Sequence, residues 1–239
     1  MTSVILFIFG AIIGSFLNVV GLRWGSKCPE GHFENFVGRS KCPYCDKTLR
    51  WYELIPILSF LFLRGRCAKC SGKISWQYPL IELFTGIVFA TVPYSLIPIF
   101  SIYIVILIYD FHHKIIPDFL VYLSIVLGFA LALLSHPLSG ISAGLLLFFF
   151  FASIWFFSRG KAMGFGDAKL ALSIGFALGL GRGIYAMTLA FWIGAVCGLA
   201  LMLLSKKNIT MKTEIPFAPF LIIGAWLASS FDFNFLYVF

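Results

Sequence analysis

Four cysteines are the first residues of this 239-residue chain whose type and spacing could do chemistry. Cys42 and Cys45 form one pair and Cys67 and Cys70 a second, in the pattern C-x2-C-x21-C-x2-C. Two such pairs can present four thiolates tetrahedrally to Zn²⁺, and nearly this spacing is a recognised zinc signature. The pattern therefore predicts a four-cysteine zinc site. Free or redox-active thiols are the alternative.

Two aspartates form the second candidate site. Asp110 ends an apolar run that follows Pro98, and Asp167 directly precedes the uncharged run 170–181. Two carboxylates that face each other in a low dielectric cannot easily both ionise, so they titrate as a pair that shares one proton. Aspartic proteases use such a pair: one carboxylate activates water, and the other protonates or polarises the scissile carbonyl.

Less specific roles for Asp167 remain open at this point. It could form a salt bridge with Lys169 or Lys161, or it could cap the N-terminus of a helix. Gly164 and Gly166 precede it, and glycines there allow close backbone approach and unusual dihedral angles. The G-x-G-D motif is weak evidence by itself, so the elements that carry it have to be considered.

Composition indicates that these elements are membrane helices. Sixty per cent of residues are hydrophobic and only 12% are charged, against about 25% charged in soluble domains. This composition excludes a cytosolic globular protein, a disordered chain and a nucleic-acid-binding module. We therefore expect an all-α polytopic membrane protein and no nucleic-acid partner.

The uncharged runs predict about eight transmembrane helices and one polar loop, 23–78. The first run carries no charge and lacks a basic n-region and a cleavage signal, so it predicts a retained helix and not a signal peptide. The expected helices are 2–22, two within 79–109 separated by Pro93 to Pro98, two within 119–158 separated by a turn at 136–140, a short one at 170–181, one at 183–205, and one from 215 to the C-terminus.

Two of these helices are too short to cross a bilayer unless they extend through an aspartate. Twelve helical residues reach about 18 Å, whereas the hydrocarbon core is roughly 30 Å thick. The run after Pro98 and the run 170–181 must therefore continue through Asp110 and Asp167. Both carboxylates are then expected just below the membrane surface, on the same side.

The basic residues predict the orientation. With eight helices the two termini share a side, and placing both outside puts 17 of the 18 Lys and Arg residues in inside segments, leaving only Arg182 outside. The formal charge of +8 is thus explained by membrane topology. Because the cysteine loop lies on the basic, reducing side, disulfides are disfavoured there.

Several other polar or reactive residues have simpler expected roles. Asp118 follows Pro117 and is expected to be a helix N-cap, and Asn18 is expected to form an interhelical hydrogen bond. Cys197 is expected to be a packing residue. Roles for four residues stay open, namely Cys28, His32, His112 and His113: the histidines at 112 and 113 could be titrating partners of Asp110 or a solvated, lipid-facing pair.

The order of motifs resembles the type IV prepilin peptidases, bacterial inner-membrane aspartic proteases of the G-x-G-D type, many of which are also N-methyltransferases. The resemblance covers nearly the whole chain. The matching segments are GSFLNVV (14–20), SKCPYC (40–45), IPILSF (55–60), LRGRCAKC (63–70), YPLIEL (78–83), Asp110 through IPD (110–118), GFGDAKL (164–170) and IPFAPF (215–220). In the last segment Ala218 replaces the family's usual glycine, and 24–37 has no counterpart.

The resemblance implies that three segments of the chain have different roles. Residues 1–22 would form the first helix, 23–78 a cytoplasmic zinc-binding loop associated with methyl transfer, and 79–239 the membrane-embedded peptidase. It implies that Asp110 and Asp167 are the catalytic dyad, supported by Gly164, Gly166 and Lys169. The expected partners are type IV prepilin or pseudopilin precursors of pilus, type II secretion or competence systems, together with the lipid bilayer.

The resemblance also implies S-adenosylmethionine as methyl donor, because the intact zinc loop is typical of the bifunctional members. The cofactor-binding residues are unknown at this stage; Glu53, Glu82 and the basic residues of the loop are candidates. Two alternatives remain: a peptidase without methyltransferase activity, and a small proton-coupled transporter in which the aspartates form a relay. The expected location is the bacterial inner membrane, with the active site facing the cytoplasm.

Overall fold

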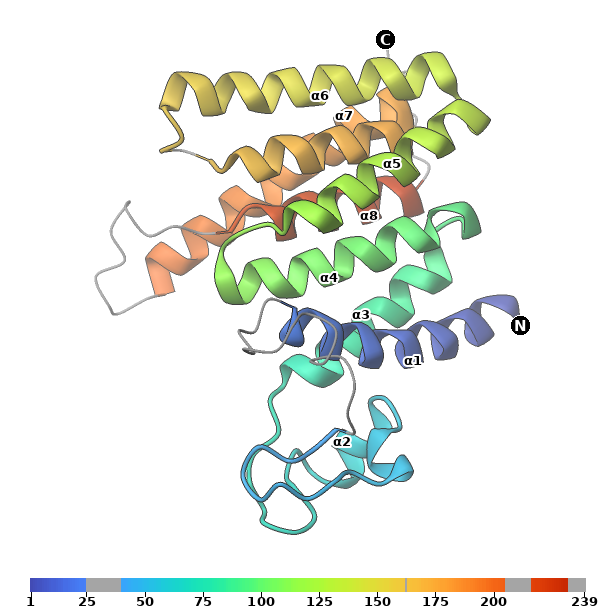
Figure 1. The fold of residues 1–239 in the computed structure, drawn as a ribbon, viewed down its shortest axis with the longest axis vertical. Helices are drawn as coiled ribbons and strands as arrows, with labels where there is room; N and C mark the ends of the chain where they lie inside the picture. The colour runs from blue at the N-terminus through green and yellow to red at the C-terminus, as the bar shows by residue number, and fades with distance from the viewer. Residues whose placement is uncertain (25–39, 162, 205–215, 232–239) are drawn as a thin grey trace. The chain divides into compact units, whose positions relative to one another are not determined.

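The computed structural model describes residues 1–24, 40–161, 163–204 and 216–231 (Figure 1). Within these ranges the chain is helical, with two isolated β-bridges and no strand, which confirms the predicted all-α class. Two compact units are present, Met1–Thr91 and Val92–Phe239. Cys28 and His32, whose roles stayed open, lie outside the described residues.

In the first unit, α1 (Thr2–Arg23) packs against α3 (Gln77–Thr91). Gly10 and Gly14, one helical turn apart, allow this contact. A Cβ at Gly14 would lie 2.7 Å from the Thr85 Cβ, so only a glycine permits the observed approach. Small residues at such spacing let membrane helices approach closely. At the loop end of the pair, Gln77 Nε2 donates to Asn18 Oδ1 at 3.2 Å, which confirms the predicted interhelical role of Asn18.

Between α1 and α3 the described part of the loop holds only short helices. They are η2 (Trp51–Leu54) and α2 (Leu58–Phe62). The remaining backbone forms turns around the two cysteine pairs. A segment with so little regular structure has a small apolar core, so its fold depends on polar contacts and on the cysteines.

In its described residues the second unit carries five helices and the short η3 (Tyr94–Leu96). The helices are α4 (Ile97–His113), α5 (Asp118–Ser135), α6 (Pro137–Ser158), α7 (Phe165–Leu204) and α8 (Ala218–Ser230). α7 packs against α5, α6 and α8, while α4 packs against α5 and α8 (Figure 1). α7 is thus the central helix of this unit.

Five helical segments in the described residues are long and apolar enough to cross a membrane. They are α1, α5, α6, α7 and the stretch 94–113 that contains α4; α8 is apolar but shorter. This supports a multi-pass membrane protein. The count of eight crossings stays a prediction.

The predicted helix breaks are largely where the structure has them. The chain between Pro93 and Pro98 forms η3, and His136 alone separates α5 from α6. One break was misplaced: α7 kinks at Gly179, with φ 76° and ψ 179°, and continues as a helix through Arg182. Glycine permits this conformation, whereas the sequence argument had relied on the charge of Arg182.

Both short helices extend through their aspartates, as their lengths required. α4 runs through Asp110 to His113, and α7 begins at Phe165 so that Asp167 lies in its first turn. The prediction that each span continues through its carboxylate is confirmed.

Candidate functional site

Asp110 and Asp167 are both buried, with 3% and 7% of their surfaces exposed. Asp110 lies in the last turn of α4 and Asp167 in the first turn of α7, and the two carboxyl groups are close enough to interact electrostatically. Among the described residues, Asp110 Oδ2 is a buried oxygen with no hydrogen-bond partner. A buried carboxylate normally finds a partner, since desolvating it without one is costly. The unsatisfied oxygen is therefore available for a water molecule or a substrate atom.

The two glycines before Asp167 contribute in different ways. The backbone of Gly164 hydrogen-bonds the Asp167 carboxylate, and the Asp167 N–H donates to the Gly164 carbonyl at 3.2 Å. A Cβ at Gly166 would lie 3.1 Å from the Ile116 Cβ, which is tighter than ordinary contact. The glycine at 166 thus lets the start of α7 approach the segment that follows α4.

A buried hydrogen bond joins the two helices that carry the aspartates. Tyr103 of α4 and Ser173 of α7 contact each other through their hydroxyl groups at 2.8 Å, and both residues are at most 1% exposed. Tyr103 lies about two helical turns from Asp110, and Ser173 lies less than two turns from Asp167. This pair was not among the residues predicted from the sequence. The only sign of it there is that a tyrosine and a serine, both polar, stand within apolar helices.

Lys169 pairs with Asp118 and not with Asp167. Its Nζ lies 2.6 Å from Asp118 Oδ1 and above the ring of Tyr122 at 4.9 Å. The expectation that Asp118 caps α5 is wrong: Pro117 is the N-cap residue, and Asp118 makes no capping hydrogen bond. The pair instead connects the first turns of α5 and α7.

The two histidines after Asp110 are exposed on the last turn of α4. His112 Nδ1 lies 2.9 Å from the Ile108 carbonyl, and His113 Nδ1 lies 3.3 Å from the Tyr109 carbonyl. Each ring is engaged by its own helix. This arrangement favours the solvated pair over the titrating partners of Asp110.

The four cysteines gather at one point of the first unit. All four sulfur atoms lie within 4.8 Å of one another, with Cys42 to Cys70 at 3.8 Å and Cys45 to Cys67 at 4.0 Å. Four sulfurs arranged tetrahedrally around one zinc ion at 2.3 Å are about 3.8 Å apart. The set could therefore hold a metal ion with little rearrangement.

The two cysteine pairs are built as copies of one turn. The Asp46 N–H donates to the Cys42 carbonyl at 3.0 Å, and the Ser71 N–H donates to the Cys67 carbonyl at 2.9 Å. Asp46 and Ser71 also share a left-handed conformation, with φ 49° and 57°. Backbone N–H groups of Cys70 and Lys69 hydrogen-bond the Cys67 sulfur and lower the pKa of its thiol to about 6. At Cys67 the turn thus favours the thiolate that a metal requires, whereas burial and the neighbouring sulfurs raise the pKa of the Cys70 thiol to about 11.

Glu53 connects the first cysteine turn to the rest of the loop. Its Oε1 accepts from Lys47 Nζ at 2.7 Å and its Oε2 accepts from the Arg50 N–H at 2.8 Å. These contacts, the Arg50 amide first, lower the pKa of the Glu53 carboxyl. Both carboxylate oxygens are thus engaged within the loop, which makes Glu53 a structural residue.

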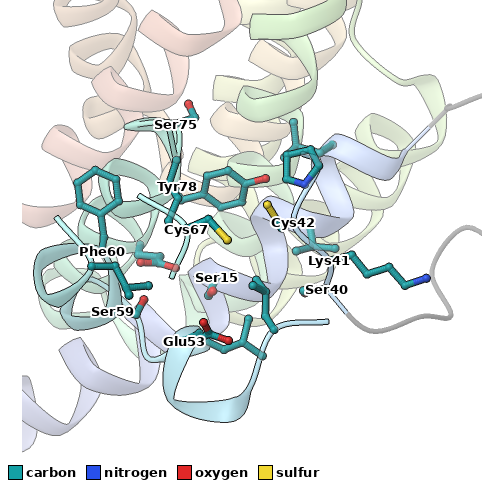
Figure 2. A pocket seen from close by; sticks show the side chains of 18 of the residues that line it. Ser15, Ser40, Lys41, Cys42, Glu53, Ser59, Phe60, Cys67, Ser75 and Tyr78 are labelled. Carbon is teal, nitrogen blue, oxygen red and sulfur yellow. The ribbon is translucent and has the colours of Figure 1, made fainter. Parts of the chain in front are cut away.

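A cavity of about 420 Å³ adjoins the cysteine cluster (Figure 2). Ser15 of α1, Glu53 of η2 and Tyr78 of α3 contribute to its wall, as do Cys42 and Cys67. Glu82 of α3 lines it as well. Sequence reasoning named the two glutamates as candidates for contact with a cofactor, but gave no sign that Ser15 and Tyr78 share their cavity.

Comparison with known proteins gives two consecutive family matches. Residues 8–96 match the model described as "Bacterial Peptidase A24 N-terminal domain", and residues 95–199 match "Type IV leader peptidase family". No solved structure matches the chain.

Curated relatives are similar over nearly their full length. A protein of Bacillus subtilis (strain 168) is 37% identical over 94% of this chain and 92% of its own. A protein of Stutzerimonas stutzeri is 31% identical over 92% of this chain and 88% of its own length. A protein of Aeromonas hydrophila is 30% identical over 94% of this chain and 89% of its own length. All three carry the name "Prepilin leader peptidase/N-methyltransferase".

Proposed function

Because the chain belongs to the type IV leader peptidase family, we propose that it removes the leader of type IV prepilins or pseudopilins and then methylates the new N-terminus. The observation that carries the first activity is the buried aspartate pair, with one carboxylate oxygen left unsatisfied. The names of the relatives, together with the four-cysteine cluster, support the second.

In the proposed cleavage, the ionised member of the dyad takes a proton from a water molecule. The water oxygen attacks the scissile carbonyl carbon while the protonated member donates to the carbonyl oxygen. The C–N bond then breaks and the leaving amine takes up a proton. The positions of Asp110 and Asp167 at helix ends suit a substrate whose leader is outside the bilayer and whose apolar helix is inside it.

Conservative replacement of either aspartate tests this proposal. Asp110→Asn or Asp167→Asn alone should lower leader cleavage by at least about a hundredfold, because an amide can neither accept nor donate the required proton. The assay is cleavage of a prepilin peptide by purified protein, followed by mass spectrometry. Asp46→Asn makes the same chemical change at an exposed position and serves as the control. Wild-type cleavage by either dyad variant would show the assignment to be wrong.

In the proposed second reaction, the new N-terminal amine attacks the methyl carbon of S-adenosylmethionine. The carbon–sulfur bond breaks, its electron pair remains on sulfur to give S-adenosylhomocysteine, and a proton leaves the amine to water. Mass spectrometry of the product separates this reaction from cleavage alone. If the cleaved product stays unmethylated at a saturating concentration of the methyl donor, the protein is a peptidase without methyltransferase activity.

We infer that the metal held by the four cysteines is Zn²⁺. Four thiolates in tetrahedral disposition favour zinc, and the ion would supply folding energy to a loop with little apolar core of its own. Purified protein should carry about one zinc per chain, and Cys→Ser at any of the four positions should lower that content. Metal-free wild-type protein would overturn the inference.

The proposed orientation places both termini outside the bacterial inner membrane and the basic loops in the cytoplasm. It rests on the distribution of Lys and Arg. A protease-cleavable tag at either terminus should be removed from the periplasmic side of spheroplasts, whereas the same tag inserted between Arg159 and Lys161 should be protected. If both terminal tags were protected, the proposed orientation would be wrong and the termini would lie in the cytoplasm.

A further inference from the structure

The cavity of the first unit is large enough and polar enough to hold a small molecule. Its volume of about 420 Å³ falls within the range of roughly 300–1,000 Å³ that is typical of small-molecule sites. Its wall combines apolar side chains of α1, such as Val19 and Leu22, with hydroxyl groups, aromatic rings and charged groups. All of these groups belong to α1, the cysteine loop and α3, so the site is complete within one unit.

The carboxyl group of Glu82 lies in the wall of this cavity, so the cavity is more than a gap between apolar side chains. Glu82 is only 7% exposed, and its Oε2 accepts from the Ile57 N–H at 2.7 Å. Its other hydrogen-bond partner is the Ser15 side chain. Both partners are neutral, and no ion pair involving Glu82 is found among the described residues. Glu53, the other carboxylate in the wall, already pairs with Lys47.

The backbone around Ile57 is arranged to hold the Glu82 carboxylate. Ile57 has φ 61°, a conformation that L-residues with branched side chains rarely adopt. The strained residue is the N-cap of α2 and directs its N–H toward Glu82. Backbone strain tends to be retained where a specific geometry is needed. The loop thus fixes the Glu82 carboxylate at the cavity wall.

We propose that this cavity binds the methyl donor, S-adenosylmethionine, and that Glu82 is the counter-ion of its positively charged groups. The proposal rests on the methyltransferase half of the proposed function and specifies its binding site. The donor carries a sulfonium and an ammonium group, both cationic, and one carboxylate. Arg23 and Lys41 also line the cavity and can attract the carboxylate.

The aromatic wall suits the remaining part of the donor. Phe60 lines the cavity, and its ring makes a tilted contact with that of Trp76, with ring centroids 4.8 Å apart; Tyr78 lines the cavity from α3 (Figure 2). Nucleobases bind well against aromatic faces, and every base has a face of this kind. The adenine ring therefore has apolar and aromatic surface available beside the charged groups.

The position of the cavity also gives the cysteine cluster a role in donor binding. Cys42 and Cys67, one from each cysteine turn, are part of the wall. A metal that fixes the four sulfurs would fix this wall as well. The metal then acts as a structural support of the donor site, with no bond to the donor required.

Direct binding measurements test the proposal. Isothermal titration of S-adenosylmethionine into full-length wild-type protein in nanodiscs should give saturable binding. Glu82→Gln keeps the shape of the side chain and removes its charge, and should weaken binding at least about tenfold. Asp118→Asn, which removes one exposed negative charge from the other unit, should bind the donor within about twofold of wild type. Ser59→Phe, which adds bulk at the cavity wall, should also weaken binding.

Two further readouts show whether a variant is folded. Each variant is assayed for zinc content and for cleavage of the prepilin peptide, which depends on the dyad of the other unit. Glu82→Gln and Ser59→Phe should retain both. A Glu82→Gln variant that binds the donor within twofold of wild type overturns the cavity site. So does a Ser59→Phe variant that binds like wild type.

Failure of this proposal can be told apart from failure of the proposed methyl transfer. If wild type methylates the cleaved product while Glu82→Gln binds the donor normally, the function stands and the site lies elsewhere. If wild type neither binds the donor nor methylates the product, the methyltransferase function itself fails, and the cavity proposal fails with it.

Discussion

At the scale of single residues, the two aspartates of the proposed dyad depend on their immediate neighbours. Asp167 is held by the backbone of Gly164, and the approach of α7 to Ile116 depends on Gly166 having no side chain. The glycines of the G-x-G-D motif thus serve different purposes, one as a hydrogen-bonding backbone and one as free space.

Replacing these glycines with alanine should therefore have unequal effects. Gly166→Ala places a methyl group 3.1 Å from the Ile116 Cβ and should lower cleavage by about tenfold, because the start of α7 has to shift. In Gly164→Ala the added Cβ meets the Asp167 Oδ2 at 3.6 Å and the Gly166 nitrogen at 4.0 Å, both ordinary contact distances, so this change should cost less. Steady-state cleavage of a prepilin peptide measures both.

A second substitution identifies the cause. Ile116→Val removes one methylene near the added group and should restore part of the activity of Gly166→Ala. If Gly164→Ala were the more damaging change, or if the double variant showed no recovery, contact with Ile116 would not be the reason for the glycine at 166.

At the scale of helices, α4 and α7 must be held in register so that their carboxylates face each other. The hydrogen bond between Tyr103 and Ser173 is buried at a depth where water cannot replace it. A hydrogen bond of this kind contributes about 1 kcal/mol to stability. Leaving one of the two buried hydroxyl groups without its partner destabilises the protein by more than this amount, because that group stays desolvated. The pair is thus a positioning contact for the dyad.

Tyr103→Phe should lower cleavage several-fold, by about 1 kcal/mol in transition-state stabilisation, while the protein stays folded. A register defect should reduce kcat more than it raises KM. The double variant with Ser173→Ala should be no worse than the single one, because both changes remove the same interaction. Strictly additive losses, or an unchanged kcat, would assign the pair to general stability alone.

The ion pair of Lys169 and Asp118 belongs to the same scale but carries less weight. It connects α7 to α5 at 2.6 Å, yet the Asp118 side chain is 68% exposed. Exposed pairs are worth between zero and about 1 kcal/mol. The supporting role that the family resemblance implied for Lys169 stays a prediction, and its ion pair connects two helices without involving Asp167.

At the scale of the whole molecule, the two candidate sites lie in separate compact units. The aspartates and the helices that hold them belong to Val92–Phe239, whereas the cysteines and the cavity belong to Met1–Thr91. The proposed peptide cleavage and the proposed methyl transfer would therefore depend on different parts of one chain.

This division predicts that metal removal affects the two activities differently. Chelation that strips the four cysteines should abolish methylation of the processed peptide, because the wall of the cavity loses its support. Leader cleavage should fall by no more than about twofold. Both products are quantified by mass spectrometry in the same reaction, and re-addition of Zn²⁺ should restore methylation. Equal loss of both activities on chelation would contradict the independence of the two units.

Much of this arrangement was accessible from the sequence, for reasons that are local. Charge was so scarce that Asp110 and Asp167 were conspicuous, and helix length then placed them inside their helices. The cysteine pattern predicted the cluster because each C-x2-C turn is formed by consecutive residues. Helix breaks at Pro93–Pro98 and His136 followed from residue type, whereas the kink at Gly179 could not be told from the other glycines of α7.

Contacts between distant segments were decided only by the tertiary structure. Nothing in the sequence distinguishes Asp118 as the partner of Lys169, or Ser173 as the partner of Tyr103, because each contact depends on how two helices are rotated about their axes. Local pattern determines which residues are polar within an apolar helix. Packing determines which of them meet, and in the part of the chain that the structure describes it places Glu82, which forms no ion pair there, beside a cavity of about 420 Å³.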